Sequence, residues 1–503
     1  MKKLLLYSIL LLNLNLAFSQ WNQIGQTLTG ARLLFGNSVS ISGDGLRIAT
    51  IDKDNNGYVN VYELQGTSWQ ALGNPIGPLT MGFNNPVDLD YDGDRLVVSG
   101  VGGNPDSYGL CFLTYSFNGT DWEQLGNTHI CGDYMNLIIE NYSGDAKISD
   151  DGARIMVAAA DVGNLDVWRP GVLEVYELIG DEWTLMGDSF IIGYNIYGDR
   201  GVNMAMNADG SKIAIGDPNS PTIHSSDMPP IAYEFGSARV YEWQGNTWVS
   251  TSTNLNDSSA NFGRNFGSAV SFNAAATRIA IGAVGDDTDI TDVGIVKVFQ
   301  QNASDASWSQ LGNTIYGETT GHEIGRDVTL NSTGNVLAIG AAGADAEGNY
   351  SVKVYRLIDD VWTLVDTPII LGDTTLPWNN LFYQPYNSFI EFSETGRLAL
   401  AFPYGETEGR VQVFENPSLS IKEAVSLQLE LYPNPFANTL SIKLKKIAKG
   451  TWSITSLQGQ QILQGDFSSK QIQLDVSKIK TKGVYFLKVE TAKGTITKKI
   501  IKT

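Results

Sequence analysis

Residues 35–77 read FGNSVSISGDGLRIATIDKDNNGYVNVYELQGTSWQALGNPIG, and their pattern returns along the chain. Ser38 to Ser42 and Tyr58 to Leu64 alternate apolar and polar residues, and a mostly apolar run lies between them. The turn Gly43-Asp44-Gly45 follows the first segment, and Trp69 opens a fourth. Alternation at period two, bounded by Asp-Gly and Gly-rich turns, predicts an antiparallel meander of four short strands.

Each of the four strand types occurs seven times before residue 416. Most copies of the fourth strand begin Trp-x-x-[Leu/Ile/Met]-Gly, whereas WVSTS at 248 and WTLVD at 362 depart from this motif. The spacing between successive copies suits a four-stranded propeller blade with generous loops. The repeated tryptophans are Trp21, Trp69, Trp122, Trp183, Trp248, Trp308 and Trp362.

The order of the copies predicts a closed ring. The chain starts with a fourth strand at Trp21 to Gly25, and its seventh unit ends with a third strand at Arg410 to Glu415. Pairing of these two segments would complete the last sheet and remove an open edge. The sequence therefore predicts an all-β, seven-bladed β-propeller over residues 20–415, closed by its N-terminal strand.

Charge is divided unevenly along the 503 residues, which are too many for one core. The whole chain carries −20, but residues 425–503 contain 13 Lys and only 4 acidic residues. Residues 20–424 contain 19 basic and 50 acidic residues. Such an acidic body repels nucleic acid and anionic membranes, so neither is an expected partner.

The first 19 residues are typical of a secretory signal peptide. Lys2-Lys3 precedes the apolar run Leu4 to Leu16, and Ala17-Phe18-Ser19 predicts cleavage before Gln20. No later stretch is long and apolar enough to suggest a transmembrane segment. Export also permits a disulfide between Cys111 and Cys131, although two buried thiols fit the sequence equally well.

A different, Lys-rich unit follows residue 415. Residues 416–426 are predicted to form a linker, and residues 427–503 a small antiparallel sandwich. Its predicted strands are Leu440 to Leu444, Thr451 to Thr455, Gln471 to Val476, Gly483 to Thr491 and Thr495 to Ile501.

Five ordered motifs in this unit resemble the type A C-terminal sorting domain of type IX secretion cargo from Bacteroidetes. They include LYPNP at 431–435, SLQG at 456–459, LDVS at 474–477, GVYFL at 483–487 and KKI at 498–500. The resemblance implies an Ig-like fold, interaction with the type IX machinery, and a secreted or outer-surface location. The sorting-motif residues are Tyr432, Pro433, Asn434, Pro435, Gly459, Gly483, Tyr485, Lys498 and Lys499.

The repeats themselves resemble the FG-GAP repeats of integrin-α-type propellers. Phe266-Gly267 precedes a first strand and Gly282-Ala283 ends a second strand, with similar pairs in other copies. The calcium loop of that family lies between its first and second strands. Here that place holds only tight turns such as Ser42-Gly43-Asp44-Gly45, so the metal sites of the family do not carry over.

Two acidic loops between the second and third strands are candidates for calcium. Asp52, Asp54, Asn56 and Glu63 match an EF-hand pattern, but Glu63 falls within a predicted strand that would carry it away from the loop. A solvated acidic turn is the alternative for both loops, and no cofactor is firmly expected. The second loop contains Asp286, Asp287, Asp289 and Asp292.

The candidate ligand-binding residues lie in a long loop on the same expected face. Aromatic rings beside Asn and Asp suit stacking on a glycan or contact with a protein, whereas packing between blades is the alternative. We therefore expect a binding protein, with a secreted carbohydrate-active hydrolase or lyase, or a structural adhesion protein, as alternatives. The loop aromatics are Trp378, Phe382, Tyr383 and Tyr386.

Overall fold

The computed structural model is built of β-strands in the residues that it describes, and it divides into two compact units, Met1–Ser420 and Ile421–Thr503. Among these residues, no helix could cross a membrane. The described residues are 21–30, 35–52, 57–79, 86–104, 107–126, 144–159, 171–192, 203–218, 221–223, 232–234, 236–252, 255–256, 263–286, 293–319, 322–341, 351–365, 367–370, 390–402, 409–416, 429–444, 450–456, 461–469, 471–491 and 494–502.

The stretch that begins at Phe35 forms the four predicted strands. They are β2 (Phe35–Ile41), β3 (Arg47–Asp52), β4 (Tyr58–Gln65) and β5 (Ser68–Ala71), hydrogen-bonded in that order. All three pairings are antiparallel. The turn between β2 and β3 closes because Gly45 adopts a positive φ of 71°, which residues with a Cβ rarely adopt.

The same antiparallel arrangement recurs in the described part of the first unit, in which seven sheets follow a four-stranded path. The next three sheets use β6 (Val87–Leu89), β7 (Arg95–Asn104), β8 (Ser107–Phe117) and β9 (Trp122–Gln124); β10 (Gly144–Ile148), β11 (Arg154–Ala159), β12 (Gly171–Ile179), β13 (Glu182–Leu185) and β14 (Phe190–Ile192); and β15 (Asn203–Met206), β16 (Lys212–Asp217), β19 (Ser237–Trp243) and β20 (Trp248–Ser250). The hairpin β17 (Pro221–Ile223) and β18 (Ala232–Glu234) forms a separate two-stranded sheet.

Two further sheets carry a fifth strand, and the last sheet recruits the start of the chain. They use β21 (Gly263–Phe272), β22 (Arg278–Asp286), β23 (Ile295–Gln301), β24 (Trp308–Gln310) and β25 (Ile315–Tyr316); and β26 (Val328–Leu330), β27 (Val336–Ala341), β28 (Ser351–Ile358), β29 (Val361–Leu364) and β30 (Ile369–Ile370). The last uses β31 (Ile390–Phe392), β32 (Arg397–Phe402), β33 (Arg410–Glu415) and β1 (Asn22–Thr29).

The predicted closure by the N-terminal strand is confirmed. β1 pairs antiparallel with β33, with Asn22 opposite Glu415 and Ile24 opposite Val413. The register shifts between Ile24 and Leu28, where Gly25 has a φ of 69°. The first and last strands of this unit therefore belong to one sheet.

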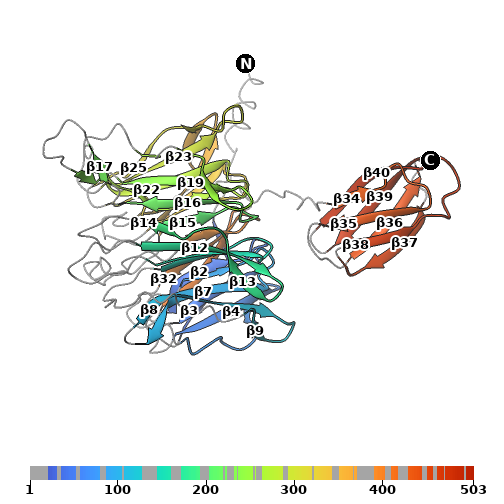
Figure 1. Ribbon diagram of the computed structural model, residues 1–503, viewed down its shortest axis with the longest axis horizontal. Helices are drawn as coiled ribbons and strands as arrows, with labels where there is room; N and C mark the ends of the chain where they lie inside the picture. Colours follow the sequence, from blue (N-terminus) through green and yellow to red (C-terminus); the bar gives the residue numbers. More distant parts are fainter. Residues whose placement is uncertain are drawn as a thin grey trace, which may run out of the picture. The chain divides into compact units, whose positions relative to one another are not determined.

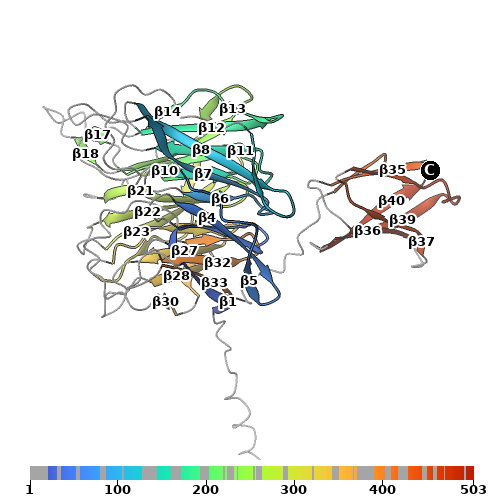
Figure 2. The same ribbon diagram turned by 90° about the horizontal axis from the view of Figure 1, so that it is seen from below.

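The first strands of the seven sheets contact one another in cyclic order. Contacts run from β2 through β6, β10, β15, β21 and β26 to β31, and β31 contacts β2 again. Figures 1 and 2 show these sheets side by side. The fold of this unit is therefore propeller-like.

An indole hydrogen bond joins neighbouring sheets. Trp69 Nε1 donates to the Ile24 carbonyl at 3.0 Å. A Cβ on Gly25 would lie 2.5 Å from the Trp69 ring, so the Gly of the Trp-x-x-Φ-Gly motif (Φ, an apolar residue) makes room for the indole of the next sheet. The equivalent bonds are Trp122 to Leu72 (2.9 Å), Trp248 to Met186 (2.8 Å) and Trp362 to Leu311 (2.9 Å), while Trp183 reaches Leu125 through the Thr114 hydroxyl.

Trp308 departs from this pattern. It follows the copy that begins Trp248-Val-Ser-Thr-Ser, which lacks the apolar residue and the Gly of the motif. Its Nε1 is buried and has no hydrogen-bond partner among the described residues.

The C-terminal unit consists of two sheets that share an apolar core. The five predicted strands are present, and β34 and β37 were missed by the sequence analysis. In β37 the alternation is interrupted by Gly465, over which the Trp452 indole packs. One sheet contains β34 (Leu429–Tyr432), β35 (Thr439–Leu444) and β38 (Gln471–Asp475), and the other β37 (Gln461–Phe467), β36 (Gly450–Ser456), β39 (Gly483–Thr491) and β40 (Gly494–Lys502).

The Trp308 exception yields a matched test of the indole bond. W362F should lower the free energy of unfolding by about 1 kcal/mol more than W308F, because only the first removes a made hydrogen bond. Both changes remove the same atoms, and because Trp362 is buried and Trp308 half-buried, the difference contains lost packing as well as the lost bond. Urea unfolding would measure it, and equal losses would contradict this account.

Candidate functional site

The seven first strands place one residue each at an equivalent position, and we call this set the inner ring. In each sheet the residue just after the first strand donates its backbone N–H to the carbonyl of the residue that begins the second strand, as Ser42 N does to the Arg47 carbonyl. The inner-ring residue lies two positions earlier. The ring comprises Ser40, Asp88, Lys147, Ala205, Ser271, Thr329 and Glu391.

Five inner-ring side chains accept a hydrogen bond from the next first strand around the ring. A first strand pairs with its own sheet on one edge only, so its inward N–H groups need other acceptors once buried. The bonds run from Leu89 N to Ser40 Oγ (3.0 Å), Ile148 N to Asp88 Oδ2 (2.8 Å), Leu330 N to Ser271 Oγ (3.0 Å), Phe392 N to Thr329 Oγ1 (3.3 Å) and Ile41 N to Glu391 Oε2 (3.1 Å).

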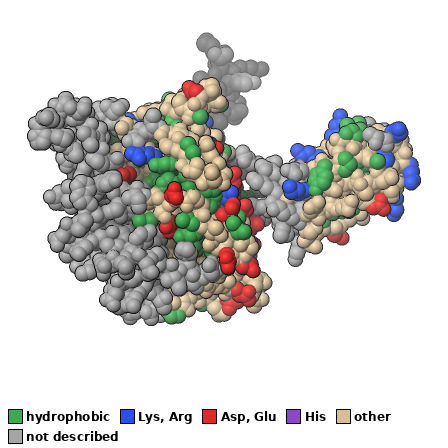
Figure 3. All heavy atoms as spheres, viewed as in Figure 1, with side chains coloured by type: hydrophobic (Ala, Val, Ile, Leu, Met, Phe, Trp, Pro, Cys, Tyr) green, Lys and Arg blue, Asp and Glu red, His purple; other side chains and the backbone are tan. Residues whose placement is uncertain are grey.

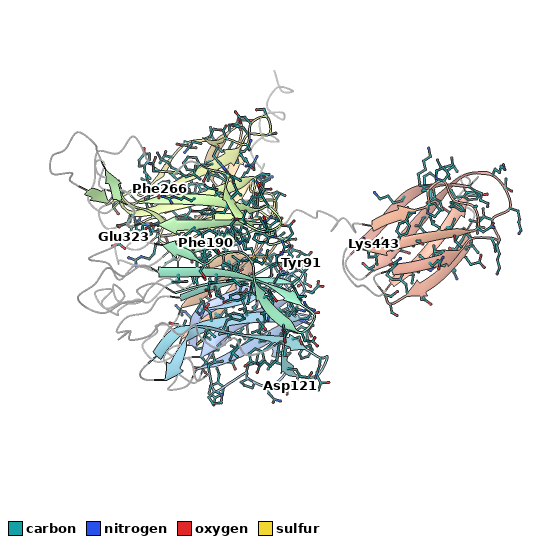
Figure 4. The ribbon with its side chains drawn as sticks, viewed as in Figure 1. Tyr91, Asp121, Phe190, Phe266, Glu323 and Lys443 are labelled. Carbon is teal, nitrogen blue, oxygen red and sulfur yellow. The ribbon has the colours of Figure 1, made fainter. Side chains whose placement is uncertain are left out.

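Hydrogen bonds between turns form a second circle around the same axis, all of them between backbone groups except the one from the Ser332 hydroxyl to the Glu394 carbonyl. Tyr91 N donates to the Asp150 carbonyl at 3.2 Å, and Asp150 N donates to the Ala208 carbonyl at 2.8 Å. The circle closes where Thr395 N donates to the Gly43 carbonyl at 3.3 Å. Figure 4 labels Tyr91 in the region of these short turns and Glu323 farther along the unit.

These strands and turns surround a cavity of about 210 Å³. Its wall is charged: Asp88, Asp145, Asp327 and Glu391 line it, together with Lys147 and Arg326. Lys147 Nζ lies 3.8 Å from Asp88 Oδ1, and Ser40 Oγ donates to the same oxygen at 3.1 Å. We call this space the axial cavity.

Burial shifts the titration of the cavity carboxyls. It raises the pKa of Asp145 to about 7, although Lys147 and the Ala146 N–H favour the ionised form. It raises the pKa of Glu391 to about 8, and the charge of Asp88 adds to this rise. Burial alone would lower the pKa of Lys147, but the surrounding carboxylates, Asp88 first, raise it, so the amine is charged at neutral pH.

Sequence reasoning missed these residues. In Val39-Ser40-Ile41 and Val87-Asp88-Leu89 the polar residue is typical of a solvent-facing strand position, yet Ser40 and Asp88 are buried. The available signal was the recurrence of Ser, Thr, Asp or Glu at one register of five copies of the first strand.

The candidate calcium residues are only partly described. Asp52 ends β3, and Asp286 ends β22. Glu63 pairs with Arg47 at 3.0 Å within its sheet, which agrees with its expected distance from the loop. Among the described residues, no group of three or more His, Cys, Asp or Glu could hold a metal, and calcium stays a prediction. Asp54, Asn56, Asp287, Asp289 and Asp292 lie outside the described residues.

The remaining sequence candidates of the first unit lie mostly outside the described residues. The signal peptide does so, and so do the loop aromatics Trp378, Phe382, Tyr383 and Tyr386. Cys111 is disulfide-bonded, but Cys131 also lies outside, so their pairing stays a prediction.

In the C-terminal unit the opening and closing sorting motifs bind each other. Asn434 Oδ1 accepts from Ile501 N at 2.9 Å, and its Nδ2 donates to the Lys499 carbonyl at 3.1 Å. Phe436 N donates to the Ile501 carbonyl at 2.8 Å. The side-chain amide of Asn434 thus makes the two hydrogen bonds to β40 that the backbone of a neighbouring strand would otherwise make.

The other motif residues surround this contact or lie elsewhere on the unit. The Tyr432 hydroxyl accepts from Gln471 Nε2 at 2.8 Å, and the Tyr485 hydroxyl donates to the Thr481 carbonyl at 2.9 Å. Lys498 and Lys499 are exposed, and Figure 3 shows basic side chains around this unit. Pro433 and Pro435 flank Asn434, Gly483 begins β39, and Gly459 lies outside the described residues.

Residues 430–503 match the family described as "Secretion system C-terminal sorting domain". The match confirms the predicted type IX sorting domain, and it indicates a secreted or cell-surface protein that engages this machinery. No curated protein matches the chain.

Solved structures resemble the chain only distantly. The hydrazine synthase of Kuenenia stuttgartiensis shares 14% identity over 65% of this chain and 83% of that chain, with a TM-score of 0.41. The β-propeller domain of the Trilobed protease from Pyrococcus furiosus shares 9% over 77% and 95%, with a TM-score of 0.42. The GH74 xyloglucanase from Xanthomonas campestris shares 13% over 85% and 60%, with a TM-score of 0.42.

D145N should make the stability of the first unit less dependent on pH. Between about pH 4 and 7 the folded protein holds a proton on Asp145 that the unfolded chain has released, so wild-type stability falls as pH rises through this window. The Asn variant should lose this part of the slope. Unfolding followed by Trp fluorescence would report it, because ten of the eleven Trp lie in this unit.

The control for this experiment is D121N. The Asp121 carboxylate is exposed, and hydrogen bonds from Asn74 lower its pKa, so the variant should keep the wild-type slope above pH 4. Identical slopes in wild type and D145N would contradict the assignment.

N434A should loosen β40 and reduce export. The change removes two hydrogen bonds to the backbone of the last strand, with an expected loss of about 1 kcal/mol because the site is exposed. Immunoblots of surface and periplasmic fractions would measure export. Q461A, which alters an exposed side chain of β37, is the control; wild-type export of N434A would refute the role of this contact.

Proposed function

We propose that this protein is an exported seven-bladed β-propeller that binds an extracellular glycan or protein. The observation that carries this proposal is the axial cavity, whose wall presents hydrogen-bonding side chains from several sheets. Concave sites with a few convergent polar groups are the usual places for ligands in proteins. The loop aromatics and the acidic loops would extend the site, with or without calcium.

The hydrogen bonds of the inner ring favour binding over acid–base catalysis. Asp88 and Glu391 each accept from a backbone N–H of the next strand. Ser271 Oγ accepts the same bond at an equivalent position, although a hydroxyl cannot serve as a carboxylate base. The carboxylates therefore have a structural task that explains their presence.

A secreted carbohydrate-active hydrolase or lyase is the second candidate. The raised pKa values of Asp145 and Glu391 favour it, because a protonated carboxyl beside an ionised one is the arrangement used in glycoside hydrolysis. Release of reducing sugar from bound polysaccharide would identify this activity, and D145N should then abolish release without abolishing binding.

A structural adhesion protein is the third candidate. Exposed apolar side chains cluster on β28 to β30, as a contact surface would require. They are Ile358, Val361, Leu364 and Ile370, each 40–50% exposed.

Arrays of glycans and extracellular matrix proteins test the proposal. The mature protein should bind at least one member, and chelator should weaken binding if the acidic loops hold calcium. If the protein binds none of the glycans or proteins on the arrays, the proposed binding function is wrong.

A further inference from the structure

The inner ring is interrupted at two adjacent positions. Lys147 carries no acceptor in its charged form, and Ala205 has no polar side chain. By the register of the other sheets, these positions should serve the N–H groups of Met206 and Phe272. Among the described residues, neither N–H has a hydrogen-bond acceptor.

The interruption opens onto the axial cavity. Ala205 and Met206 of β15 and Phe272 of β21 line it, and small side chains on both elements leave space there. Asn203 also lines it, and its buried Nδ2 has no partner among the described residues. The lining residues with small side chains are Ala205, Ala208, Ala269, Ser271 and Ala274.

Three unpaired donors therefore face one sector of the cavity: Met206 N, Phe272 N and Asn203 Nδ2. A buried donor without an acceptor is destabilising, so this sector favours an occupant that supplies acceptor oxygens. At roughly 15 Å³ for each enclosed water, the space of about 210 Å³ exceeds what a single bridging water would need.

The charged side chains on the rest of the cavity wall indicate whether the occupant is an anion, a cation or a neutral molecule. An anion would satisfy the donors, but the two basic side chains of the wall already pair with carboxylates, Lys147 with Asp88 and Arg326 with Glu323, so neither is left to neutralise a further negative charge. A cation would suit the carboxyls of the wall but could not accept from the N–H groups. A neutral hydroxyl does both, because it accepts through its oxygen and donates through its hydrogen.

We propose that the axial cavity binds a neutral sugar residue, seated against β15 and β21 where the inner ring is interrupted. This inference rests on the proposed binding function and chooses glycan over protein. Hydroxyl oxygens of the sugar accept from Met206 N and Phe272 N, and its hydroxyl hydrogens donate to the carboxyls on the other sheets.

The variant A205S tests this assignment directly. A Ser at this register should accept from Phe272 N, as Ser40 accepts from Leu89 N, and it would occupy part of the sector. The melting temperature should stay equal or rise, while affinity for sugar falls at least tenfold. A205T, with the larger side chain, should lower affinity further, and T363S, at an exposed position of β29 that does not line the cavity, should change neither.

The probes are methyl glycosides of neutral hexoses and pentoses, with glucuronate and glucosamine as charged comparisons, measured by calorimetry on the mature protein. At least one neutral glycoside should bind at least tenfold more tightly than either charged sugar. Binding of no neutral glycoside, or tighter binding of a charged sugar, overturns the inference and leaves water as the occupant.

The array separates this inference from the proposed function. If A205S and A205T keep wild-type binding to a glycan or protein on the array, the protein is a binder that uses another surface, and only the axial sugar site is refuted. If wild type binds nothing on the array or in calorimetry, both proposals fail.

Discussion

The ring depends on how each sheet is joined to the next. Neighbouring sheets meet through side chains and through single hydrogen bonds between their turns, so their spacing must be set by specific contacts. The Trp-x-x-Φ-Gly motif does this, because the carbonyl before the Gly receives the indole N–H of the next sheet and the missing Cβ admits the indole ring. Arg47 makes a second link between the same kind of neighbours, close to the turns. It pairs with Glu63 of its own sheet and donates a hydrogen bond to the Gly93 carbonyl of the next sheet. Errors in spacing would accumulate over seven joints and prevent β1 from reaching β33.

The strand repeat and the ring closure could be predicted from the sequence because both leave local signals in it. The alternation in Tyr58 to Leu64 and the unpaired fourth strand at Trp21 are visible without knowledge of any contact. The inner ring could not be predicted in the same way. Ser40 accepts from Leu89 N, 49 residues away in the next sheet, and the polar residue of an alternating strand is ordinarily solvated. The loop aromatics such as Trp378 remain a prediction from composition alone.

A few acidic residues of the first unit are buried rather than exposed to solvent. Figure 3 shows Asp and Glu on the visible surface of this unit, but Asp88 and Asp145 are buried beside Lys147. Burial of these carboxyls is tolerable because backbone N–H groups and one amine compensate their charge. Their raised pKa values also keep a fraction of the carboxyls protonated and uncharged at neutral pH.

One of the two interruptions of the inner ring, Ala205, cannot be explained by the requirements of folding. Ser and Thr serve at Ser40, Ser271 and Thr329, and a similar hydroxyl at Ala205 would satisfy the Phe272 N–H with little added volume. Ala at this position leaves a donor unpaired and lowers stability. The Lys147 interruption is adjacent, and its amine compensates the charge of the buried carboxylates, Asp88 first. Ala205 is therefore the departure that lowers stability and leaves space in one sector of the cavity, which a binding site would require and a purely structural ring would have no reason to keep.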